Sequence, residues 1–173
     1  MEYKPLWEYT RDLHHACEDH LVGAAMSTGN PPRIWYAAWL KALYQIHLVL
    51  DKNCEQLISR SIEIKQDIEF MDIEIPELNT ATSFVEQLDN SKKIDGAIYV
   101  LTGAHLMGGE IMRRRLVDFP TKHLEWEDRK KSIAILQNYR TRDDIGDEAR
   151  GCFAALLSIM DEILERYPNE TIS

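Results

Sequence analysis

The stretch GAIYVLTGAHLMGGEIMRRRLVD, residues 96–118, decides the fold, because it is an apolar helical run that contains Gly103, Gly108 and Gly109. A glycine inside a helix costs about 0.5–1 kcal/mol relative to alanine, so these three together cost roughly 2–3 kcal/mol. A helix that bends and lets a flat ligand lie directly against its backbone explains this cost. Close packing of two helices in a hairpin explains it as well, and the stretch alone does not separate the two interpretations.

Length and composition indicate a globular chain. With 173 residues, 45% of them hydrophobic and 28% charged, we expect one domain over residues 1–173 with a sizeable core. The chain has 20 basic and 29 acidic residues, a net charge of −9. This balance argues against a nucleic-acid partner, because phosphate contacts need a basic face. It leaves room for a small anionic ligand held by a few local cations.

The cysteines and the termini bear on the cellular environment. Cys17, Cys54 and Cys152 are an odd number without a CxxC pair, which predicts neither a disulfide framework nor a structural zinc site. The N-terminus has no apolar core of a signal peptide, and no run approaches 18 apolar residues. We therefore expect a cytoplasmic protein without a membrane segment.

Apolar residues recur at helical spacing along the chain, and proline and glycine clusters separate the runs. There is no alternation of strands and helices and no internal repeat. The pattern predicts an all-α bundle of six to eight helices. The expected helices cover residues 5–26, 33–53, 55–69, 81–88, 90–119, 125–139 and 144–167, with residues 72–79 as a connector and Asn90-Ser91 as a cap.

One face of the first expected helix carries chemistry. Its residues, at steps of three and four, are Trp7, Arg11, His14, Glu18 and Leu21. A histidine followed by a carboxylate one turn later suits a metal ligand, because the carboxylate accepts the other ring N–H and fixes the tautomer. Arg11 can meet an anionic group of the same ligand. A solvated helix with chance histidines is the alternative, since His15 and His20 lie nearby.

The segment LWEYTRDLHHACEDHLVGAAMSTG, residues 6–29, resembles the start of heme oxygenase. That family carries the pattern Glu-x-Thr-[Lys/Arg]-[Asp/Glu]-x-His-x-x-x-Glu around its proximal heme ligand. The resemblance implies that His14 binds the heme iron and that Glu18 orients its ring. It also implies the fold, an all-α bundle of the heme oxygenase type in a single domain.

Three further segments in the same order strengthen the resemblance. Residues 99–109 are similar to the distal helix of the family, whose glycines let the backbone lie over the heme. Tyr139-Arg140-Thr141-Arg142 is similar to its Tyr-Arg-Ser-Arg, in which the first arginine binds a propionate. Residues 148–164 resemble its last helix, with Phe153 at an aromatic position of the heme pocket. Arg11, Arg140 and the Tyr99 hydroxyl are therefore the expected propionate contacts.

The resemblance also implies the reaction. In heme oxygenases heme b is both cofactor and substrate, and it is cleaved with O2 and electrons to biliverdin, CO and Fe2+. The electron donor is a partner protein such as a ferredoxin, a flavodoxin or an NADPH-dependent reductase. Gly103, Gly108 and Gly109 would shape the pocket on the distal side.

The distal side departs from the family. His105 stands where an Asp is common, and His47 stands where a Tyr is common; in the family both belong to a water network that supplies protons. Two histidines can order water and deliver protons near neutral pH, or one can reach the iron and block O2. We expect His105 to face the heme and His47 to be a core residue. Smaller departures are Leu101, Ala104, Met107 and Leu136.

Three other functions stay open on this sequence. A heme carrier or sensor on the same fold binds heme without turnover. A non-heme di-iron oxidase needs about six ligands on facing helices, of which His14/Glu18 and His47/Asp51 offer two pairs. A thiamine-degrading relative of the fold needs a catalytic cysteine, for which Cys152 lacks a histidine nearby in sequence.

Overall fold

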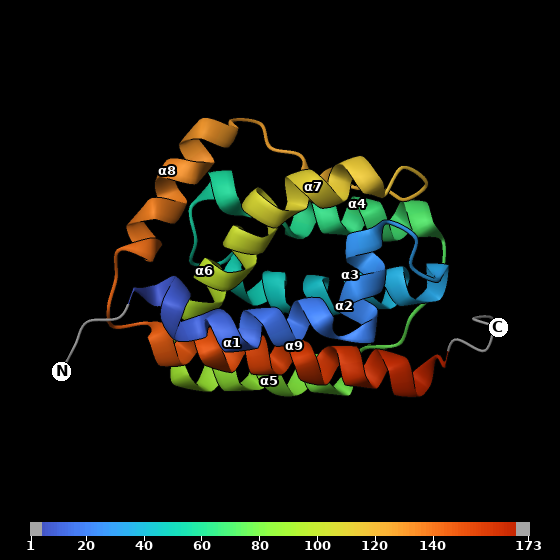
Figure 1. The fold of residues 1–173 in the computed structure, drawn as a ribbon, viewed down its shortest axis with the longest axis horizontal. Coiled ribbons are helices and arrows are strands. Elements are labelled where there is room, and N and C mark those ends of the chain that lie inside the picture. Colours follow the sequence, from blue (N-terminus) through green and yellow to red (C-terminus); the bar gives the residue numbers. More distant parts are fainter. Residues whose placement is uncertain (1–4, 169–173) are drawn as a thin grey trace.

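The computed structural model describes residues 5–168, which form helices joined by short connections (Figure 1). This confirms the expected all-α bundle. The α-helices of these residues are α1 (Leu6–Asp19), α2 (Leu21–Thr28), α3 (Arg33–Leu50), α4 (Ser61–Met71), α5 (Asn79–Ser91), α6 (Asp95–Gly103), α7 (Gly109–Arg115), α8 (Arg129–Arg140) and α9 (Gly146–Arg166). Shorter turns are η1 (Gln56–Ile58), η2 (Ala104–Gly108) and η3 (Lys122–Leu124).

Two helices organise the bundle. α9 runs along the long axis of the molecule, and α1, α5 and α6 all pack against it (Figure 1). α3 is buried over most of its circumference and packs against α4, α5 and α9. The core joins the apolar stripes of these helices, so their arrangement follows from burial of apolar surface.

The glycine-rich stretch forms one bent segment, defined by α6, η2 and α7 and covering residues 95–115 without a break. Its middle part, η2, is a π-helix. Such a bulge widens one turn, and it is frequent at functional sites. Counted with this segment as one helix, the described part of the chain has eight helices.

Gly96 brings α6 unusually close to α9. A Cβ atom at Gly96 would lie 2.4 Å from the backbone nitrogen of Ala149 and 2.3 Å from Cβ of Glu148. The N–H of Gly96 donates to the Glu148 carboxylate at 3.3 Å. The absence of a side chain at this position therefore sets how closely the bent segment approaches α9.

The expected helix over residues 5–26 is in fact two helices. His20 has extended backbone angles between α1 and α2, its Nδ1 accepts from Val22 N–H at 3.1 Å, and its Nε2 lies 2.7 Å from Asp161. A Cβ atom at Gly23 would lie only 2.0 Å from the Cys17 carbonyl oxygen, so glycine is required where the first turn of α2 meets the last turn of α1. A capping histidine is not a signal that helix periodicity contains.

Other boundaries also differ from the sequence expectation. The helix expected over residues 55–69 begins at Ser61, after η1, because the Asp51 carboxylate accepts from the N–H groups of Arg60 and Ser61. Asn90-Ser91 does not cap the next helix; it forms the last turn of α5, and α6 starts at Asp95. The connector expected at residues 72–79 is confirmed up to Leu78.

Candidate functional site

The bent segment has an open side. A Cβ atom placed at Gly103 or at Gly108 would meet no other atom within 4 Å. Ala104, Met107 and Ile111 are exposed on the same side. These two glycines therefore do not serve helix packing, and they leave bare backbone facing a space.

α1 presents its histidine and carboxylate at the surface. His14 Nε2 lies 2.8 Å from the Glu18 carboxylate, and the two side chains are 55% and 54% exposed. The His14 ring also lies 5.7 Å, centroid to centroid, from the ring of Phe153 on α9. His14 thus has a carboxylate partner and an aromatic neighbour, while its ring stays accessible.

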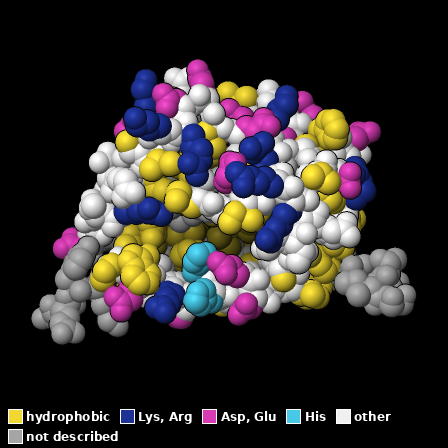
Figure 2. All heavy atoms as spheres, turned by 45° about the horizontal axis from the view of Figure 1, so that its top comes forward, with side chains coloured by type: hydrophobic (Ala, Val, Ile, Leu, Met, Phe, Trp, Pro, Cys, Tyr) yellow, Lys and Arg dark blue, Asp and Glu magenta, His cyan; other side chains and the backbone are white. Residues whose placement is uncertain are grey.

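A groove separates α1 from the bent segment. Both α1 and α6 pack on α9, yet within residues 5–168 α1 makes little or no contact with η2. Figure 2 shows a hollow on this face with hydrophobic side chains along its floor, histidines on one rim and lysine or arginine side chains around the other. The bare backbone of Gly103 and Gly108 on the bent segment and the exposed histidines of α1 are the candidate walls of this hollow.

Three polar residues named in the sequence analysis lie on three different helices, α1, α6 and α8. Arg11 is exposed on α1 with its guanidinium 5.8 Å from the Trp7 ring. Tyr99 is partly buried on α6, and its pKa is raised by burial, which the neighbouring Arg140 guanidinium and Thr10 hydroxyl partly oppose. Arg140 on α8 and Tyr99 are therefore close together, and they offer a cation and a hydroxyl to one anionic group.

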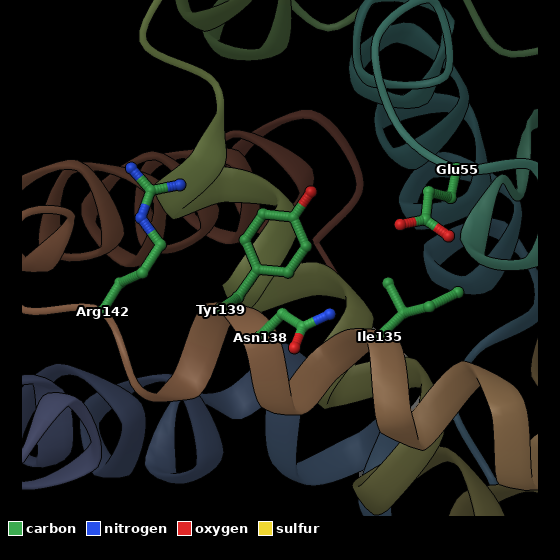
Figure 3. Close-up of a pocket in the computed structure, with 5 residues that line it drawn as sticks. All are labelled: Glu55, Ile135, Asn138, Tyr139 and Arg142. Carbon is green, nitrogen blue, oxygen red and sulfur yellow. The ribbon is translucent and has the colours of Figure 1, made fainter.

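The structure divides the Tyr139–Arg142 motif between two faces. Tyr139 and Arg142 line a separate cavity of about 250 Å3 with Glu55, Ile135 and Asn138 (Figure 3). Arg142 is held by the carboxylates of Asp95 and Asp144, its contact with Asp144 being 2.7 Å long. Of the two arginines in the motif, only Arg140 contributes to the pKa of Tyr99.

His105 lies on the closed side of the bent segment, contrary to the expectation that its side chain faces the groove. It is buried, its ring is stacked on that of His47 at 5.4 Å, and the ring of His123 meets it edge-on at 5.5 Å. Burial, then His47, His123 and Arg60, lower the pKa of His105 well below its ordinary value, so its ring is neutral at pH 7. His47 is a core residue, as expected.

Gly109 also belongs to the closed side. A Cβ atom there would lie 2.9 Å from Cδ2 of Leu124. Gly109 therefore permits close packing against η3, and the two interpretations of the glycines both apply: Gly103 and Gly108 expose backbone, whereas Gly109 serves packing.

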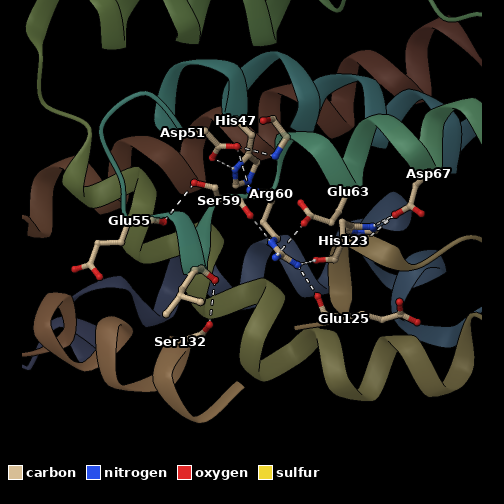
Figure 4. A network of polar contacts seen from close by, with 12 residues as sticks. His47, Asp51, Glu55, Ser59, Arg60, Glu63, Asp67, His123, Glu125 and Ser132 are labelled. Atoms are coloured by element: carbon tan, nitrogen blue, oxygen red, sulfur yellow. Dashed lines mark hydrogen bonds and ion pairs between the residues drawn. The ribbon is translucent and has the colours of Figure 1, made fainter. Parts of the chain in front are cut away.

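Behind His105 lies a polar network that the sequence analysis missed (Figure 4). His123 Nδ1 lies 2.6 Å from the buried Asp67 carboxylate, which also accepts from the backbone N–H groups of Lys122 and His123. His47 Nδ1 lies 3.4 Å from Asp51. Asp67 shares an apolar stripe at helical spacing with Ile64, Ile68 and Met71, and this signal could have revealed a buried charged group.

The other site types suggested by the sequence gain no support from the described residues. Among residues 5–168, no group of three or more His, Cys, Asp or Glu side chains is placed to hold a metal ion, so the pairs His14/Glu18 and His47/Asp51 do not form one di-iron site. Burial raises the pKa of Cys17 to about 11 and raises that of Cys152 further, so neither thiol is ionised at neutral pH. Over the same residues no helix has the length and hydrophobicity needed to cross a membrane.

Comparison with solved structures identifies the fold. The chain is similar to heme oxygenase-1 of the cyanobacterium Synechocystis sp. PCC6803 in complex with heme, with a TM-score of 0.77, 18% identity, and coverage of 93% of this chain and 91% of that one. The heme oxygenase of Leptospira interrogans has a TM-score of 0.75 and 19% identity, with coverage of 91% of this chain and 97% of that one. Heme oxygenase-2 of Synechocystis sp. PCC 6803, in complex with heme and NO, has a TM-score of 0.76 and 17% identity, with coverage of 93% of this chain and 84% of that one.

No family model and no curated protein matches the sequence. Sequence identities of 17–19% to the solved structures show a common architecture and leave the activity to be argued from the groove. The eight helical segments of the described chain thus adopt the heme oxygenase fold.

Proposed function

We propose that this protein is a heme oxygenase: it binds heme in the groove between α1 and the bent segment and cleaves it with O2 and electrons to biliverdin, CO and Fe2+. The electrons would come from a ferredoxin, a flavodoxin or an NADPH-dependent reductase. The fold similarity supports the proposal, because the Synechocystis structures are complexes with heme.

One observation carries the proposal. An accessible histidine bonded to a carboxylate lies on α1, and two glycines without neighbours lie on the bent segment; in this proposal they form the two walls of the groove. A flat porphyrin needs an axial ligand on one face and a smooth, close backbone on the other. The residues present therefore fit heme.

Each residue has a distinct task in this proposal. Bound heme supplies both the iron that activates O2 and the porphyrin ring that is oxidised. His14 would bind iron through one ring nitrogen while the other donates its hydrogen to Glu18, which keeps the ring oriented and makes it a stronger ligand. Arg140, Tyr99 and Arg11 would hold the propionates by charge-assisted hydrogen bonds.

The backbone at Gly103 and Gly108 would keep the opposite face narrow and exclude bulk water from it. His105, neutral and behind this backbone, would hold a proton for the distal side. Phe153 would pack against both His14 and the porphyrin, because its ring already lies beside the ring of His14.

Adding hemin to the purified protein tests the binding step. We expect a Soret band from bound heme, its loss or displacement in His14→Ala, and no change in His15→Ala. His15 is the matched control because it is exposed on the same helix and lies 6.1 Å from His14, ring to ring. An unchanged spectrum in His14→Ala would overturn the proposed ligand.

Reductant added to the hemin-loaded protein in air tests the reaction. Bilin absorbance together with release of CO supports the oxygenase. Heme binding without either product supports the second candidate, a heme carrier or sensor. Met107, which is 43% exposed on the open side, favours that candidate, because its thioether is a second side chain that could bind the iron.

A further inference from the structure

The helix that carries His14 has few buried side chains. The buried residues of α1 are Leu6 and Thr10. Leu13 and Cys17 are partly buried and pack against the core. A helix with so little buried surface shifts or rotates at small cost in free energy. Contacts other than apolar packing therefore have to fix the orientation of α1, and with it the direction in which His14 points.

Arg150 of α9 binds α1 just before His14. Its guanidinium donates to the carboxylate of Asp12 through both terminal nitrogens, at 2.7 and 3.0 Å, and to the Tyr9 carbonyl oxygen at 2.7 Å. Such a two-pronged contact between an arginine and a carboxylate fixes direction as well as distance. The Asp12 side chain is 66% exposed, so the ion pair adds little to global stability. The main effect of this contact is therefore on the orientation of α1.

The ring of Tyr9 belongs to the same set of contacts. Its hydroxyl donates to the Asp147 carboxylate, and the guanidinium of Arg150 lies 5.4 Å from the ring centroid. A Cβ atom at Gly146 would lie 2.7 Å from Cδ1 of Tyr9, so this ring is in direct contact with the first turn of α9. We call these four residues the α1 clasp: Tyr9 and Asp12 of α1, with Asp147 and Arg150 of α9.

The α1 clasp and His14 lie on opposite flanks of α1. With about 3.6 residues per turn, Tyr9 and Asp12 fall to one side of the buried stripe and His14 falls to the other. α1 and α9 run in the same direction (Figure 1), and further along both helices the ring of His14 meets that of Phe153. A rotation of α1 about its axis that opens the α1 clasp therefore moves His14 relative to Phe153.

We propose that Arg150 is a positioning residue: through the α1 clasp it fixes the rotation of α1, and so the angle at which the His14 ring meets a heme iron. The inference rests on the proposed function, in which His14 is the iron ligand. In that function Glu18 orients the ring itself, whereas Arg150 orients the helix that carries both residues. His20, whose Nε2 lies 2.7 Å from Asp161, anchors the far end of α1 to α9. His14 thus lies between two fixed points.

α9 offers a matched arginine at its other end. Arg166 likewise binds a carboxylate, that of Glu162 at 2.6 Å, and a backbone carbonyl oxygen, that of Glu77 at 3.0 Å. The side chains of Arg150 and Arg166 are exposed to a similar degree, 33% and 24%. The partners of Arg166 lie in α9 itself and in the connector before α5, not in α1. A variant of Arg166 therefore removes an equivalent contact of the same helix and leaves the α1 clasp intact.

The first test uses the protein without heme, so its result does not depend on the proposed function. Hydrogen exchange followed by NMR measures how often the backbone N–H groups of α1 open to water. In Arg150→Gln we expect exchange at Leu13 and His14 to become about three- to fivefold faster, the effect of an exposed ion pair of good geometry. Arg166→Gln should leave these rates unchanged. Equal rates in the wild type and Arg150→Gln would overturn the proposal, and so would equal acceleration in Arg166→Gln.

The second test uses the hemin-loaded protein, reduced in the absence of O2. Resonance Raman spectra give the stretching frequency of the bond between iron and histidine, which depends on the tilt of the imidazole rather than on global stability. We expect this frequency to shift in Arg150→Gln and to stay unchanged in Arg166→Gln. Gly146→Ala should shift it as well, because the added methyl group displaces Tyr9 while every charge remains.

An unchanged frequency in both Arg150→Gln and Gly146→Ala would overturn the positioning role. A shift in Arg150→Gln alone would overturn it too, because the charge of Arg150 would then act without movement of α1. If Arg150→Gln does not fold, Asp12→Asn replaces it and removes the same contact from the α1 side. If the wild type shows no bond between iron and His14, the proposed function fails at its ligand, and the exchange rates still decide whether the α1 clasp fixes α1.

Discussion

The two sides of the bent segment use the same pair of groups, an imidazole and a carboxylate, in opposite ways. On the groove side His14 and Glu18 lie 2.8 Å apart and are about half exposed. On the closed side His123 and Asp67 lie 2.6 Å apart and are almost fully buried. The contact lengths hardly differ, so burial decides whether such a pair is free to bind a ligand or holds the fold together.

The largest effect should come from removing the carboxylate charge of the buried pair. Asp67→Asn removes one of the two oxygens that accept from three N–H groups inside the protein, and we expect it to lower the free energy of unfolding by about 3–5 kcal/mol. Glu18→Gln, the matched change in the exposed pair, should lower it by less than about 1 kcal/mol. Urea unfolding of both variants measures this, and equal losses would show that burial does not distinguish the pairs.

Substitutions at two neighbouring glycines, Gly108 and Gly109, should have the next largest effect and should distinguish the open side of the bent segment from its closed side. Gly109→Leu inserts a side chain against Leu124, and overpacking should lower the free energy of unfolding by about 1–3 kcal/mol. Gly108→Leu projects into open space, so we expect no loss of stability but loss of hemin binding. Thermal unfolding and hemin titration of the two variants check this. Retention of hemin binding by Gly108→Leu would place the ligand elsewhere.

The pH dependence of the free energy of unfolding should show the lowered pKa of His105. Because its folded-state pKa is lowered well below 6.5, the unfolded chain takes up a proton that the folded protein does not, and stability falls as pH falls below that value. Between about pH 7 and about pH 5.5 this linkage removes about 1 kcal/mol from the free energy of unfolding. Urea unfolding at both pH values should show the loss in the wild type but not in His105→Gln. The same loss in both proteins would assign it to another group.

The smallest effect is expected at Gly103. Gly103→Ala should raise the free energy of unfolding by about 0.5–1 kcal/mol, because alanine favours a helix and its Cβ meets nothing. Hemin binding should weaken in the same variant. Gly151→Ala in α9, where Cβ also has no neighbour, is the control that should stabilise equally without affecting binding. Stabilisation without weaker binding in Gly103→Ala would remove this glycine from the groove wall.

Sequence periodicity predicts the fold well because the apolar stripes that form the helices are the surfaces that pack. Local spacing likewise pairs His14 with Glu18 one turn apart. It could not place His105, whose surroundings come from α3 and η3, far away in the chain. Nor could it find the break at His20, which depends on Asp161 of the last helix.

The close approach of α6 to α9 at Gly96 fixes the spacing between the bent segment and α9. Both α1 and α6 pack against α9, so the distance between α6 and α9 determines how thick a flat ligand the groove can admit. The absence of a side chain at Gly96, in the first turn of α6, therefore influences the width of the groove further along the bent segment. Selection for a different ligand thickness could act at this remote position without altering any residue that touches the ligand.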